Sequence, residues 1–159
     1  MFNRIASAVE RVIDLALIVL ISVMVVSICY QVVGRYLLNH APGWTEEIAR
    51  FLMAWITMLG SAMVMRTDGH VAVTIAADIL PDPLRHAVGW LRDALILTMA
   101  GALGYYGYLF ALIGDRRDSA AMEISMYWPH LSIPVGAALI ALLLLLRRLD
   151  QVATGRKEP

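Results

Sequence analysis

Residues 15–34 read LALIVLISVMVVSICYQVVG and contain no charged side chain. Three further stretches are also free of Asp, Glu, Lys and Arg, namely residues 51–65, 94–114 and 124–146. A helix that crosses the hydrocarbon core of a bilayer, about 30 Å thick, needs roughly 17–25 residues. The stretch 51–65 is short, so a helix that spans the membrane here must also include Ile48 and Ala49 and must have Arg50 near one end. The pattern predicts four transmembrane helices.

The composition of the whole chain agrees with a membrane protein. Of its 159 residues, 60% are hydrophobic and 16% are charged, and the mean hydropathy is +0.69. A soluble domain is nearer to about 25% charged residues. The formal net charge is zero, whereas nucleic-acid binding requires a basic surface. We therefore expect an all-α membrane protein with one membrane domain over residues 1–159 and no nucleic-acid partner.

Turn-forming residues between the apolar stretches set the expected helix boundaries. Thr45 is predicted to be the N-cap of the second helix, and Pro134 falls in the first turn of the fourth. Arg4 and Arg11 precede the first apolar stretch, as in a signal peptide. That stretch is longer than the roughly 7–15 residues of a signal-peptide core, so we expect an uncleaved helix. The four helices are expected at residues 13–33, 45–65, 87–113 and 131–146.

Residues 70–80 form an apolar segment between the second and third helices that is too short to span a bilayer. Its apolar residues recur at helical spacing, with Thr74 and Asp78 beside them. Such a pattern predicts a short amphipathic helix lying at the membrane interface. A loop with incidental apolar residues is the alternative.

The distribution of Lys and Arg predicts the orientation of the chain. With both termini in the cytoplasm, nine of the 13 Lys and Arg residues face inward. The remaining four face outward: Arg35, Arg50, Arg116 and Arg117. Cytoplasmic loops carry the excess of positive charge. We therefore expect both the N-terminus and the C-terminus to be cytoplasmic.

Few residues in the chain are candidates for chemistry. Cys29 is the only cysteine, which excludes an intrachain disulfide and a cysteine-based metal site. No predicted helix carries a charge near its centre, where a proton or ion pathway would place one. Facing helices also lack a histidine pair for a haem. We predict no catalytic residue, no cofactor and no metal, and hence a protein that is not an enzyme.

The motif Trp44-Thr45-Glu46-Glu47-Ile48-Ala49-Arg50 is the most informative polar stretch. Glu46 and Arg50 are four residues apart, and Glu47 and Arg50 are three apart, so either carboxylate can neutralise the arginine on one helix face. One interpretation is a salt bridge that lets Arg50 sit at the membrane edge. The other is a polar anchor that positions the second helix against a partner. The residues alone leave both open.

Small residues mark places where helices approach closely in membranes. The second helix contains Gly60-Ser61-Ala62, and the third contains Ala100 and Gly104 four residues apart. The contact could be within the bundle or with another subunit, and we expect it to be with other helices of the same bundle.

These residues together resemble a known signature. Trp44-x-Glu46-Glu47-x-x-Arg50 is followed by Trp55, Leu59-Gly60-Ser61-Ala62, Arg66 and His70-Val71-x-Val73. This pattern is similar to that of the small membrane subunit of TRAP (tripartite ATP-independent periplasmic) transporters. The Leu80-Pro81 step and the Ile133-Pro134-Val135-Gly136 opening of the fourth helix agree with it. The chain departs from the pattern at Thr74, where an aspartate is expected.

The resemblance implies a division of labour within a complex of the bacterial or archaeal inner membrane. A large membrane subunit carries the sodium and substrate sites, and a periplasmic substrate-binding protein delivers an organic acid. The small subunit packs beside the large one, among membrane lipid, and widens its stationary scaffold. The residues expected to anchor it are Trp44, Glu46, Glu47, Arg50, Gly60 and His70.

Two other functions are alternatives to this interpretation. A membrane anchor of a respiratory oxidoreductase would show a haem spectrum after purification. A self-contained small transporter would move substrate when reconstituted alone.

Overall fold

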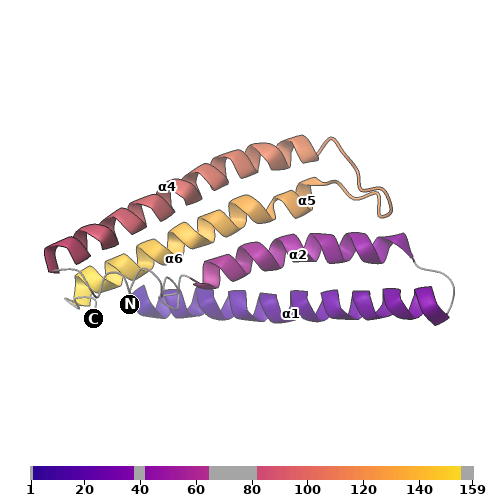
Figure 1. The fold of residues 1–159 in the computed structure, drawn as a ribbon, viewed down its shortest axis with the longest axis horizontal. Helices are drawn as coiled ribbons and strands as arrows, with labels where there is room; N and C mark the ends of the chain where they lie inside the picture. The colour runs from indigo at the N-terminus through magenta and orange to yellow at the C-terminus, as the bar shows by residue number, and fades with distance from the viewer. Residues whose placement is uncertain (1, 38–41, 65–81, 155–159) are drawn as a thin grey trace.

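A computed structural model describes residues 2–37, 42–64 and 82–154. The helices are α1 (Phe2–Leu37), α2 (Gly43–Val64), α4 (Asp82–Gly114), α5 (Tyr127–His130) and α6 (Ser132–Thr154) (Figure 1). Four segments are long and apolar enough to cross a membrane: Ala6–Leu37, Gly43–Val64, Ala87–Gly114 and Tyr127–Asp150. The predicted all-α class with four transmembrane helices is therefore confirmed. The interfacial helix expected at residues 70–80 lies outside the described residues.

The helices extend past the charged residues that bounded the apolar stretches. α1 begins at Phe2, and α4 begins at Asp82 and includes Arg92 and Asp93. Charged side chains do not interrupt the i to i−4 backbone hydrogen bonds, so a helix can continue beyond the apolar region. α2 begins at Gly43, so the prediction of Thr45 as its N-cap is wrong. The Thr45 hydroxyl instead donates to the Pro42 carbonyl at 2.7 Å.

The bundle is organised around α6. This helix packs against α4 on one side and against the antiparallel pair α1 and α2 on the other (Figure 1). Ile13, Leu59, Ala62 and Leu143 form the buried cluster where α1, α2 and α6 meet. The start of α1 and the end of α6 consequently lie at the same end of the bundle (Figure 1).

Glycines permit the closest helix contacts. A Cβ atom on Gly107 of α4 would lie 2.6 Å from Cγ2 of Ile133. A Cβ atom on Gly136 of α6 would lie 2.7 Å from Cβ of Met58. Separations this short are below van der Waals contact, so α6 approaches α4 and α2 as closely as the absence of a side chain allows.

The small residues singled out in the sequence divide into two groups. Ala62 and Ala100 are buried inside the bundle, as expected. A Cβ atom added to Gly60, Gly101 or Gly104 would meet no atom of the described residues within 4 Å. The expectation of a contact within the bundle is therefore wrong for Gly60 and Gly104, because their sides of α2 and α4 face away from the other described helices.

Candidate functional site

The motif of residues 44–50 occupies the first two turns of α2. Trp44 lies against Tyr30 of α1, with ring centroids 5.8 Å apart and the rings inclined by 30°. Stacked aromatic pairs of this kind stabilise beyond their buried area. Trp44 therefore joins the beginning of α2 to the end of α1, the two segments that flank the first loop.

Glu46 and Arg50 form an ion pair along one side of α2. The Arg50 Nη2 atom lies 3.3 Å from Glu46 Oε1, and the two side chains are 66% and 61% exposed. The pair connects consecutive turns of the same helix. Its function inside the described bundle is limited to neutralising Arg50.

Glu47 points in another direction and binds the loop between α4 and α5. Its carboxylate accepts hydrogen bonds from the Ser119 hydroxyl and from the backbone N–H groups of Ala121 at 3.0 Å and Met122 at 3.1 Å. The expectation that Glu47 shares Arg50 with Glu46 is therefore not what the structure shows. Successive residues of a helix point about 100° apart, so neighbouring carboxylates reach different partners.

The loop that Glu47 binds is itself ordered. Ser119 N–H donates to the Ile124 carbonyl at 2.9 Å, and Met126 N–H donates to the Arg117 carbonyl at 2.9 Å. Ser119 is 2% exposed. Because these bonds close the loop on itself, the Glu47 carboxylate fixes a preformed turn against the beginning of α2.

A second polar cluster lies toward the opposite end of the bundle and was missed in the sequence. The Asp93 carboxylate on α4 is 4% exposed and pairs with the Arg148 guanidinium on α6. Arg92 Nε lies 3.1 Å from the other Asp93 oxygen, and the Arg148 guanidinium carbon lies 5.5 Å from the centre of the Trp90 ring. The cluster ties α4 to α6. The interaction joins residues 55 positions apart, so local spacing carries no signal for it.

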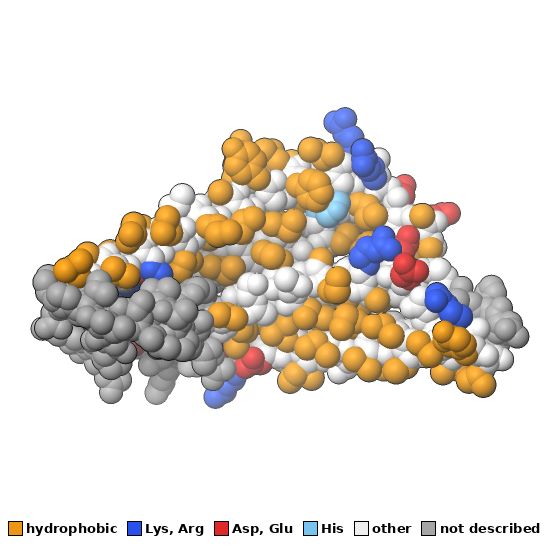
Figure 2. All heavy atoms as spheres, viewed as in Figure 1, with side chains coloured by type: hydrophobic (Ala, Val, Ile, Leu, Met, Phe, Trp, Pro, Cys, Tyr) orange, Lys and Arg blue, Asp and Glu red, His pale blue; other side chains and the backbone are white. Residues whose placement is uncertain are grey.

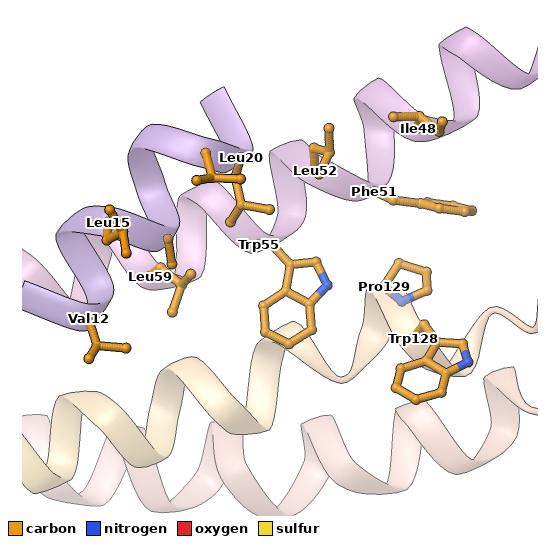
Figure 3. A pocket seen from close by; sticks show the side chains of 12 residues that line it. Val12, Leu15, Leu20, Ile48, Phe51, Leu52, Trp55, Leu59, Trp128 and Pro129 are labelled. Atoms are coloured by element: carbon orange, nitrogen blue, oxygen red, sulfur yellow. The ribbon is translucent and has the colours of Figure 1, made fainter. Parts of the chain in front are cut away.

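An apolar groove of about 690 Å³ opens between α1, α2 and α5. Figure 3 shows Trp55 and Phe51 of α2 on one side of this space and Trp128 and Pro129 of α5 on the other. Sites for organic acids require placed polar groups that fix the ligand, whereas this lining is apolar apart from the two indole N–H groups. The lining residues are Val12, Leu15, Ala16, Val19, Leu20, Ile48, Phe51, Leu52, Trp55, Leu59, Trp128 and Pro129.

One of the anticipated anchor residues has no structural counterpart. His70 lies outside the described residues. Within residues 2–37, 42–64 and 82–154, no group of three His, Cys, Asp or Glu side chains is arranged to hold a metal ion. The anchor functions assigned to Trp44, Glu46, Glu47, Arg50 and Gly60 stay predictions, although the geometry now separates inward-facing from outward-facing members.

The fold and its polar clusters define a multi-pass membrane subunit whose charged residues serve helix–helix and helix–loop contacts. The family model described as "Tripartite ATP-independent periplasmic transporters, DctQ component" matches residues 24–154. The chain therefore belongs to the DctQ family, the small permease subunits of TRAP transporters of the inner membrane. Proteins of this family are transporter subunits and not enzymes.

Characterised relatives include both separate and longer proteins. The chain is 28% identical over 136 residues to the sialic acid TRAP transporter small permease protein SiaQ of Vibrio cholerae, which covers 86% of this chain and 77% of SiaQ. It is 28% identical over 102 residues to the C4-dicarboxylate TRAP transporter small permease protein DctQ of Pseudomonas aeruginosa, which covers 61% of this chain and 49% of that protein.

A third relative is much longer than this chain. The isethionate TRAP transporter permease protein DctMQ of Oleidesulfovibrio alaskensis is 29% identical over 120 residues, which is 73% of this chain and 19% of DctMQ. In that protein, a segment similar to this chain is joined to a larger permease in one polypeptide.

Proposed function

We propose that the chain is the scaffolding subunit of a sodium-coupled, binding-protein-dependent transporter for an organic acid. Its partner is a large membrane subunit that carries the substrate and the coupling ions, and a periplasmic binding protein delivers the substrate to the assembled complex. The observation that carries the proposal is the likeness to DctMQ, in which a similar segment makes up 19% of a longer permease. Two parts that are joined in one protein are expected to assemble when they are made separately.

The construction of the bundle supports a mechanical function. α6 packs closely on both α4 and α2 through Gly107 and Gly136, and the Asp93–Arg148 pair joins α4 to α6. Packed interiors of this kind do not deform continuously. A subunit built in this way is suited to hold part of the large subunit still while another part moves.

The names of the relatives support the substrate class. Sialic acid, isethionate and C4-dicarboxylates are all organic acids that are anionic at neutral pH. We propose the same class for the complex that contains this chain, with both termini of the chain in the cytoplasm.

Reconstitution tests the proposal. The chain is co-expressed with a large TRAP permease subunit from the same genome, purified through a tag on the chain, and placed in liposomes with the binding protein. Sodium-driven uptake of an organic acid by the complex, with none by the chain alone, is the expected result. Uptake by the chain alone, or no recovery of the large subunit with it, would refute the proposal.

Arg50 offers a residue-level test of the same assembly. Arg50→Ala leaves Glu46 without its counterion within a candidate membrane span, which is costly in low dielectric. Arg116→Ala removes an exposed arginine from the loop after α4 and is the control. We expect Arg50→Ala to reduce recovery of the large subunit more than Arg116→Ala. Equal recovery would mean that the Glu46–Arg50 pair serves only the membrane interface.

A further inference from the structure

The side of α2 that faces away from the bundle carries several polar and small residues, together with the exposed apolar residues Met53 and Val64. Glu46, Arg50, Thr57 and Ser61 are exposed. A Cβ atom added to Gly60 would meet no atom of the described residues within 4 Å. Their spacing of three, four or seven residues places them on one helix face. We call these five residues the outer α2 stripe. The buried residues of α2 lie on the opposite face and pack into the core.

The outward side of α1 has a different character. Its exposed residues are mostly branched and apolar, including Ile18, Val25 and Val26. The most apolar window of α1 has a mean hydropathy of 2.9, against 1.3 for α2. Figure 2 shows a white surface of backbone and uncharged polar side chains over the half of α2 that ends at Val64, with blue and red side chains nearer to its beginning. α1 therefore presents a surface that lipid solvates well, and α2 does not.

The position of the Glu46–Arg50 pair along α2 adds to the difference between the outward sides of α1 and α2. The 22 residues of α2 span about 33 Å at 1.5 Å per residue, close to the thickness of the hydrocarbon core. On the same scale Arg50 lies about 10 Å from the beginning of the helix. Charged groups within a membrane span normally face protein or water rather than lipid. This pair lies inside a candidate span, yet both of its side chains are more than half exposed.

On these grounds we infer that the outer α2 stripe is the surface that receives a transmembrane helix of the large permease subunit. This inference rests on the proposed function. Gly60 leaves space for a second backbone, which is the commonest device of helix association in membranes. A guanidinium has five N–H donors, and the ion pair with Glu46 occupies one of those of Arg50, through Nη2. The complementary helix therefore carries small residues opposite Gly60 and a carboxylate or carbonyl oxygen opposite Arg50.

The hydroxyl groups of the stripe fit the same partner. Thr57 Oγ1 donates to the Met53 carbonyl at 2.7 Å, and Ser61 Oγ donates to the Thr57 carbonyl at 2.8 Å. Each hydroxyl oxygen keeps acceptor capacity after this donation. The two groups can thus be packed tightly without a loss of hydrogen bonding and can accept from a donor on the neighbouring helix.

Tryptophan substitutions test the inference against a matched control. Thr57→Trp and Ser61→Trp place a bulky ring on the outer α2 stripe. Ser22→Trp does the same on α1, where the Ser22 hydroxyl is also exposed and also donates to a carbonyl four residues earlier, at 2.7 Å. Each variant is co-expressed with the large subunit, and the large subunit recovered per small subunit is measured. Size-exclusion chromatography of each variant expressed alone reports whether the bundle still folds.

We expect Thr57→Trp and Ser61→Trp to elute alone like the wild type and to reduce recovery of the large subunit at least tenfold, with Ser22→Trp unchanged. Wild-type recovery for both α2 variants would overturn the inference while leaving the proposed function intact. Loss of recovery for Ser22→Trp alone would assign the interface to α1 and would also overturn it. A wild-type homodimer that Ser61→Trp dissociates would assign the stripe to a second copy of the chain. If the wild-type chain recovers no large subunit at all, the proposed function itself fails.

Discussion

Replacing Gly107 by alanine tests how the bundle is held together. The new Cβ would lie 2.6 Å from Ile133 Cγ2, 3.1 Å from Ile133 Cβ and 3.3 Å from Pro134 Cδ. None of these atoms can move away easily, because a β-branched side chain is stiff at χ1 in a helix and a proline ring is fixed. α4 and α6 must therefore separate at this level. Overpacking of this kind costs about 1–3 kcal/mol.

Gly104→Ala is the matched control, one turn away on the same helix. A Cβ on Gly104 meets nothing within 4 Å, and both substitutions gain the same helix propensity of about 1 kcal/mol. The propensity cancels in the comparison, so the difference between the two variants reports the packing alone. At about 2–4 °C per kcal/mol for a chain of this size, Gly107→Ala should melt about 2–12 °C below Gly104→Ala.

The measurement is thermal unfolding of the chain alone in one detergent, followed by its intrinsic tryptophan fluorescence. Testing the chain without its partner matters, because Gly104 faces outward and its substitution could change an intermolecular contact. If Gly107→Ala and Gly104→Ala melt at the same temperature, the close packing of α4 against α6 at Gly107 does not contribute to the stability of the chain.

Three further outcomes follow from the polar contacts and the charge distribution. Asp93→Ala should destabilise the chain by about 3–5 kcal/mol, because it removes the buried carboxylate that pairs with the Arg148 guanidinium. A double substitution of Asp93 and Arg148 by leucine should recover most of that loss, and thermal unfolding of the two variants measures both effects. Glu47→Ala should speed hydrogen exchange in the loop after α4, whereas Glu46→Ala should not, and equal exchange in the two variants would exclude the tether. Reporter fusions at the C-terminus and in that same loop should place the first in the cytoplasm and the second in the periplasm, and a periplasmic C-terminus would contradict the proposed orientation.

The course of the helices was predictable because it depends on local composition. A run of about 20 uncharged residues must be a helix in a membrane, since lipid offers no partner for backbone groups. The helix ends were less predictable. α1 begins at Phe2 rather than at residue 13, and α6 ends at Thr154 rather than at residue 146, because the charge of a side chain does not decide where backbone hydrogen bonding stops.

The partners of the polar residues were only partly predictable. The Glu46–Arg50 pair follows from helical spacing and was anticipated. The contacts of Glu47 with Ser119 and of Asp93 with Arg148 join residues 72 and 55 positions apart. Such contacts depend on how the helices assemble, and no periodicity within one helix encodes them.

The two groups of glycines impose different constraints on how the sequence can diverge over time. Gly107 and Gly136 are fixed by atoms of the same polypeptide, so substitution there is opposed in every relative that keeps this bundle, whatever it associates with. Gly60, Gly101 and Gly104 meet no such atoms. Within residues 2–37, 42–64 and 82–154, a side chain at these three positions meets no steric penalty. We therefore expect any restriction on their variation to reflect contact with another chain. Comparing the two groups across related genomes would therefore separate selection for folding from selection for association.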